Sequence, residues 1–159
     1  MTLLDLKTLV QKPAWSKEVV LWVGSDDILD ECLFGYPQAK FDILDLFSEP
    51  ETFPVAEDER RAIIKRSLNQ RLKELRPSGD NRLILRVYNI GLIGRYRVGL
   101  GPFYDWFSGS RTMVVLCLKM LKPVSFPMHL EKDLEYHVDG LIDYFKTCLA
   151  DPNKIYMER

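Results

Sequence analysis

Unbroken apolar runs and amphipathic stripes alternate along the chain. The run VVLWV (19–23) ends at the turn formed by Gly24–Asp27. RLILRVYNI (82–90) and TMVVLCL (112–118) are similar runs, and a short apolar run bounded by turn residues is typical of a buried strand. FDILDLF (41–47) suits either a strand or a single helical turn, and we predict a strand there. The pattern therefore predicts four strands.

Helices are predicted where apolar residues recur every three or four positions. One helix is predicted from Glu57 to about Arg76, with the stripe Ile64, Leu68, Leu72 and Leu75. Another is predicted over 131–149, with the stripe Leu134, Val138, Leu141, Ile142, Phe145 and Leu149. Two short helices are expected, one after Gly24 with Ser25 or Asp26 as its N-cap and one starting at Pro102.

This order of elements predicts an α/β fold, a single Rossmann-like three-layer domain over 1–159 with a mostly parallel sheet of about four strands. The strands are apolar throughout rather than alternating, which indicates a sheet covered on both faces. Ligands of such folds bind beyond the carboxyl ends of the strands. In this sequence those ends are followed by Gly24–Asp27, Asp45–Glu49, Asn89–Gly94 and the residues after Leu118.

Composition narrows the class of protein but not its function. Apolar residues make up 47% and charged residues 28%, which excludes wholesale disorder. No apolar stretch approaches the roughly 20 residues of a membrane span, and the first residues do not resemble a secretory signal. The three cysteines, Cys32, Cys117 and Cys148, form no C-x-x-C pair, so we expect buried thiols and a cytoplasmic location.

Charge is strongly segregated along the chain, although the net charge is −1. Residues 1–59 hold 4 Lys/Arg against 13 Asp/Glu, whereas residues 60–97 hold 11 against 2. The acidic third and the basic middle could neutralise each other within the fold or present two opposite faces to partners.

The basic middle supplies the candidate partner-binding residues. Arginine and lysine with interleaved aromatics suit an acidic protein surface or a nucleic acid. A slightly acidic chain argues against a dedicated nucleic-acid module, so we expect an acidic protein partner and keep a nucleic-acid-binding accessory as an alternative. No membrane partner is expected. The candidates are Arg60, Arg61, Lys65, Arg66, Lys73, Arg95, Tyr96, Arg97 and Arg111.

No catalytic residues are predicted, and we expect the protein not to be an enzyme. His129 and His137 have no nucleophile placed by the sequence. The alternative from another class is a magnesium-dependent phosphotransfer or nuclease-type enzyme in which Asp26, Asp27 and Asp45 hold the ion. Helix capping explains Asp26 and Asp27 without a metal, so no metal is expected.

Four segments follow one another over residues 19–118: VVLWVGSDDI, ERRAIIKRSLNQRLKEL, LILRVYNIGLI and SGSRTMVV. Their order resembles that of the motifs in the small P-loop accessory proteins of BREX-type bacterial phage-defence islands. Both nucleotide-binding motifs of that family are eroded here: the P-loop Lys and Ser/Thr are absent, Tyr88 replaces the magnesium-binding Asp, and Gly91 replaces the catalytic Glu. The resemblance implies a degenerate P-loop fold without a cofactor. It also implies an assembly role beside a larger defence ATPase or modification enzyme.

Overall fold

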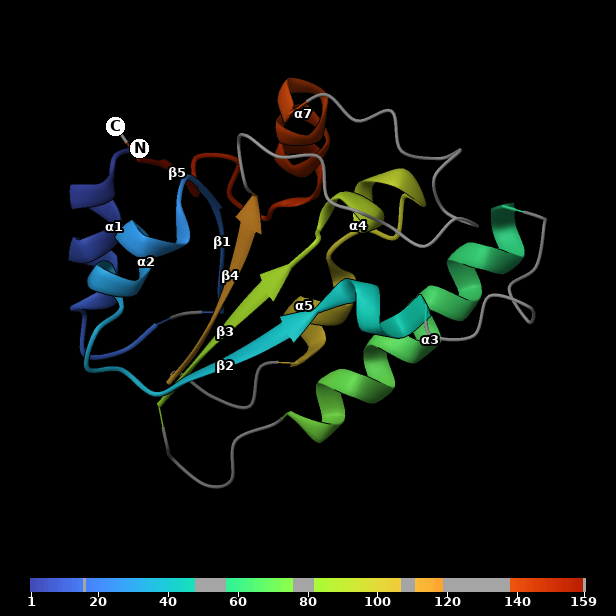
Figure 1. Ribbon diagram of the computed structural model, residues 1–159, viewed down its shortest axis with the longest axis horizontal. Helices are drawn as coiled ribbons and strands as arrows, with labels where there is room; N and C mark the ends of the chain where they lie inside the picture. The colour runs from blue at the N-terminus through green and yellow to red at the C-terminus, as the bar shows by residue number, and fades with distance from the viewer. Residues whose placement is uncertain (16, 48–56, 76–81, 107–110, 119–137, 159) are drawn as a thin grey trace.

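A single parallel sheet forms the centre of the molecule (Figure 1). The computed structural model describes residues 1–159 except 16, 48–56, 76–81, 107–110, 119–137 and 159. The strand order is β2-β3-β4-β1-β5, and every neighbouring pair is parallel. The strands are β1 (Glu18–Val23), β2 (Gln38–Asp42), β3 (Leu83–Tyr88), β4 (Thr112–Leu118) and β5 (Ile155–Met157).

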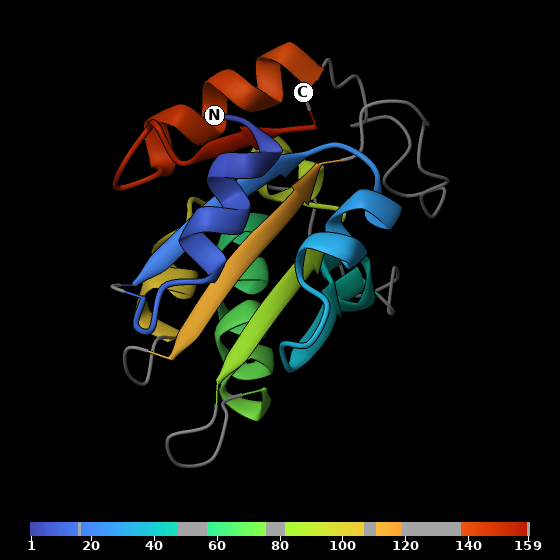
Figure 2. The same cartoon turned by 90° about the vertical axis from the view of Figure 1, so that its left-hand side faces the viewer.

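Helices cover both faces of the sheet, so the fold is a three-layer α/β arrangement as predicted (Figures 1 and 2). One face carries α1 (Leu3–Val10) and α2 (Asp26–Cys32). The other face carries α3 (Glu57–Glu74), α4 (Gly91–Arg95), α5 (Gly101–Trp106) and α7 (Val138–Cys148). A short 3₁₀ helix, η1 (Ile43–Phe47), follows β2.

Two buried clusters, one on each face, explain why the strands are apolar throughout. Successive side chains of a strand point to opposite faces. Val19, Leu21 and Val23 of β1 therefore join the cluster under α3, α4, α5 and α7, while Val20 and Trp22 join the cluster under α1 and α2. Because helices cover both faces of the sheet, both sets of β1 side chains are apolar.

The predicted helical stripes are confirmed where the structure describes them. Ile64, Leu68 and Leu72 of α3 are buried. The second half of the last predicted stripe is also buried: Leu141, Ile142 and Phe145 in α7, and Leu149 directly after it. Ser25 caps α2, because its side-chain oxygen accepts a hydrogen bond from the Ile28 N–H at 3.4 Å. Residues 131–137 of the last predicted helix, and both histidines, lie outside the described residues.

The strand predicted over 41–47 exists but lies earlier in the chain, as β2, and one further strand was missed. β2 ends at Asp42, and the chain then turns into η1. Phe41 and Ile43 are both buried, so their apolar character does not distinguish strand from turn. The fifth strand, β5, has three residues and pairs with Leu21–Val23 at the sheet edge, which is too short to leave a periodic signal.

Two further helices were not predicted. α1 begins with a capping box, in which the Asp5 N–H donates to the Thr2 hydroxyl while the Asp5 carboxylate accepts from the Thr2 N–H at 2.7 Å. α4 has only five residues and begins after Asn89, whose φ of 57° lies in the left-handed region. Glycines at both ends of this segment favour a loop on the sequence alone.

Candidate docking surface and the carboxyl rim of the sheet

The outward side of α3 carries exposed cations. Because Ile64, Leu68 and Leu72 point into the core, Lys65, Arg66 and Lys73 lie on the exposed side of the helix, as predicted. None of these three forms an ion pair with another described residue. The neighbouring Arg71, by contrast, pairs with Glu74 at 2.8 Å.

The turn after α4 brings more cations close to the start of α3. The Arg61 Nε donates to the main-chain oxygen of Tyr96 at 2.9 Å, and its Nη1 pairs with Asp58 at 3.1 Å. Arg61 therefore lies against the segment that carries Arg95 and Arg97. Arg95 is half-buried with its guanidinium 5.1 Å from the Tyr96 ring centroid, and Arg97 is exposed.

Tyr96 itself is not a surface residue. Its side chain is fully buried in the core cluster, so the prediction that it contacts a partner was wrong. The tyrosine follows α4 directly, and the alternation of Arg95, Tyr96 and Arg97 reflects one inward-pointing ring between two outward-pointing cations. Trp106 of α5 is also buried.

The remaining candidates are not all in one place. Arg60 is half-buried on α3, one residue before Arg61. Arg111 is exposed, but it precedes β4, and its main-chain oxygen accepts from the Leu83 N–H at 3.0 Å. It therefore lies at the amino edge of the sheet, whereas α4 follows the carboxyl end of β3 (Figure 1). We define the basic surface as Arg61, Lys65, Arg66, Arg95 and Arg97. Lys73 is not included, because it lies in the last turn of α3, about 18 Å along the helix from Arg61.

Part of the charge segregation is neutralised inside the fold, through Arg86 of β3. This residue is 1% exposed, and its guanidinium contacts two carboxylates of α2. Nη1 donates to Asp30 and, at 3.1 Å, to Gln38 Oε1, while Nη2 lies 3.8 Å from Asp26 Oδ1. The hydrogen bond from Arg86 holds the pKa of Asp30 below its usual value. This cluster was not predicted from the sequence, although an arginine inside an apolar run was the available signal.

Two other groups near Arg86 are held in their neutral forms. Burial raises the pKa of the Cys117 thiol to about 12 and also raises the pKa of the Tyr88 hydroxyl. The thiolate is the reactive form of cysteine, so Cys117 is chemically inert at neutral pH.

The turn after β1 is hydrogen-bonded to Glu158, which follows β5. Glu158 Oε1 accepts hydrogen bonds from the Ser25 hydroxyl at 2.8 Å and from the Ser25 N–H at 3.4 Å. A Cβ atom on Gly24 would lie 2.8 Å from Trp22 Cζ2, so the backbone here is packed against a side chain. A phosphate-binding loop offers its N–H groups to a ligand. Ser25 donates instead to a carboxylate of its own chain.

The structure does not bring together the three carboxylates of the proposed magnesium site. Asp26 lies beside Arg86, and among the residues that the structure describes, no three His, Cys, Asp or Glu side chains are grouped as Asp26, Asp27 and Asp45 would need to be.

Comparisons with known proteins found no match: no protein-family model, no curated protein and no solved structure matches the chain. Among the described helices, none has the length and apolar character needed to cross a membrane.

Proposed function

We propose that this protein is a non-catalytic interaction or assembly subunit that docks an acidic protein partner through the basic surface. The proposal rests on a difference among the cations of residues 60–97: one is paired inside the fold, and others are exposed. Arg86 forms ion pairs with Asp26 and Asp30 inside the fold. Lys65, Arg66 and Arg97 are exposed and form no ion pair with a described residue, so their charge is available to another molecule.

An acidic protein suits this surface better than a nucleic acid does. Binding of single strands uses exposed aromatic rings on which bases stack. Tyr96, which lies between Arg95 and Arg97, and Trp106 of α5 are both buried. The chain as a whole carries a net charge of −1, so it has no overall positive charge to attract a long polyanion beyond the docking site. Arginine favours carboxylates because its planar guanidinium donates two parallel hydrogen bonds.

The turn after β1 supports a role without a nucleotide. Four carboxylates, Asp26, Asp27, Asp30 and Glu31, follow this turn, and Glu158 already accepts the hydrogen bonds of Ser25. A triphosphate would meet like charge there. Together with the resemblance to BREX accessory proteins, this supports a cytoplasmic assembly factor for a larger defence ATPase or modification enzyme.

Charge reversal tests the proposal. The variant Arg66→Glu, Arg95→Glu, Arg97→Glu should keep its circular dichroism spectrum and lose its partner when purified from the native host. The control variant Lys7→Glu, Lys12→Glu, Lys17→Glu changes the net charge equally at exposed positions outside the basic surface and should keep the partner. Retention of the partner by the first variant at low salt, where charge effects are strongest, would refute the docking surface.

A further inference from the structure

Arg97 occupies a backbone position that normally belongs to glycine. The Val98 N–H donates to the Ile93 carbonyl at 3.0 Å, and the Arg97 N–H donates to the Gly94 carbonyl at 3.3 Å. These are the two hydrogen bonds of a Schellman motif, in which the residue after the cap is left-handed and usually glycine. Arg97 has a φ of 52°. A side chain is unfavourable in this conformation because Cβ approaches the following carbonyl oxygen.

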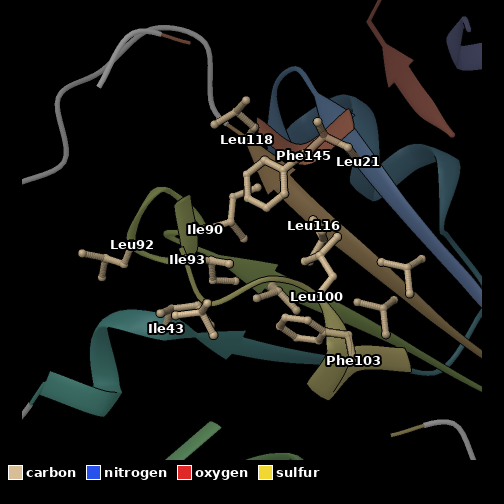
Figure 3. Packing of buried hydrophobic residues seen from close by; sticks show 14 of the residues in the cluster. Leu21, Ile43, Ile90, Leu92, Ile93, Leu100, Phe103, Leu116, Leu118 and Phe145 are labelled. Atoms are coloured by element: carbon tan, nitrogen blue, oxygen red, sulfur yellow. The ribbon is translucent and has the colours of Figure 1, made fainter. Parts of the chain in front are cut away.

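The turn that carries Arg97 is held firmly from both sides. Arg61 of α3 donates to the Tyr96 carbonyl at 2.9 Å, and the Gly99 N–H donates to the Tyr144 hydroxyl of α7 at 3.0 Å. The flanking side chains are buried, as Figure 3 shows for Ile93 on one side of the turn and for Leu100 on the other. The backbone at Arg97 is therefore fixed before any partner arrives.

We infer that Arg97 is the anchor residue of the basic surface, and that it binds a carboxylate of an acidic protein segment. This inference rests on the proposed docking function. The side chain is exposed and makes no hydrogen bond or ion pair with a described residue, and its charge acts only weakly on the Tyr144 hydroxyl. A residue that strains the backbone without forming such a contact is placed for recognition rather than for stability.

The neighbouring cations, Arg61 and Arg95, add positive charge beside Arg97 while their own guanidinium groups contact other residues. The Arg61 guanidinium is engaged by Tyr96 and Asp58, and that of Arg95 lies over the Tyr96 ring. Both keep a positive charge beside Arg97, which attracts a carboxylate to the site. Because the turn is already ordered, little conformational entropy is lost when Arg97 binds.

Two matched glycine variants separate recognition from backbone strain. Among the residues that the structure describes, Lys17 is the other exposed cation with a left-handed backbone, at φ 47°, and it lies just before β1, outside the basic surface. Arg97→Gly and Lys17→Gly remove the same charge and the same kind of strain. Both should raise the melting temperature by about 1–4 °C. The probe is a short fluorescein-labelled peptide in which glutamate alternates with alanine, measured by anisotropy at low salt, with a glutamine–alanine peptide as the uncharged reference.

Arg97→Gly should weaken binding of the acidic peptide by about tenfold or more, while Lys17→Gly changes it by less than about twofold. Equal losses in both variants would show an effect of net charge alone and would overturn the inference. So would a loss in Arg97→Gly without any gain in stability. If Arg97→Gly binds normally while Lys65→Gln, Arg66→Gln does not, the docking surface stands and the anchor is wrong. If the wild type does not prefer the acidic peptide to the uncharged one, the proposed function fails.

Discussion

The contact between Arg86 and Asp30 leads to the most quantitative prediction. Asp30→Ala removes the closest carboxylate from a guanidinium that is almost fully buried, leaving Asp26 at 3.8 Å and Gln38. Removing one partner of a buried ion pair costs about 3–5 kcal/mol. Asp30 is 54% exposed, so water can partly replace it, and we expect a loss of about 1.5–3 kcal/mol, the range for hydrogen bonds to charged groups.

Urea denaturation followed by tryptophan fluorescence measures this loss, with Glu31→Ala as the control. Glu31 is the next residue of α2, is exposed and makes no ion pair with another described residue. Because the folded-state pKa of Asp30 is lowered, its contribution is complete above the ordinary aspartate value of about 3.9 and is lost as the pH falls through the lowered value. The difference between wild type and Asp30→Ala should therefore shrink in acid. Equal stabilities of Asp30→Ala and Glu31→Ala at pH 7 would refute the reasoning.

Two further predictions concern the core and the turn after β1. Leu68→Ala and Leu141→Ala should each reduce the free energy of unfolding by about 2–5 kcal/mol in denaturant melts, whereas the exposed Gln70→Ala on α3 should change it by less than about 0.5 kcal/mol. Losses below that limit for either leucine would contradict the packing of its helix. ATP with magnesium should show no appreciable binding in calorimetry, because carboxylates follow Gly24 and Ser25 donates to Glu158. A micromolar affinity would contradict this.

Much of the fold follows from the sequence because its long elements have strong periodic signals. β4 runs over the predicted residues 112–118, and α3 spans most of the predicted helix. The missed elements have other causes. β5 contains three residues and is defined by its pairing with β1, and α4 is stabilised by tertiary contacts of Ile93 and Leu92 rather than by its own glycine-containing sequence.

The candidate site was only partly predictable, for a different physical reason. A helical stripe shows which side of α3 is exposed, so Lys65, Arg66 and Lys73 could be placed outside. Nothing in the local sequence distinguishes Tyr96, which is buried, from the exposed Arg97 beside it. The contacts of Arg86 with Asp26 and Asp30 join segments far apart in the chain, and such pairings depend on strand order.

The most direct test of the docking surface is a photo-crosslinker placed at Gln70, on the exposed side of α3, or at Gln11, beyond the end of α1. In the native host, the Gln70 position should give a specific protein adduct whose crosslinked peptide is rich in aspartate and glutamate. That adduct should disappear in the Arg66→Glu, Arg95→Glu, Arg97→Glu background, and the Gln11 position should not give it. An adduct that forms only from Gln11, survives the charge reversal or contains nucleic acid would contradict the account.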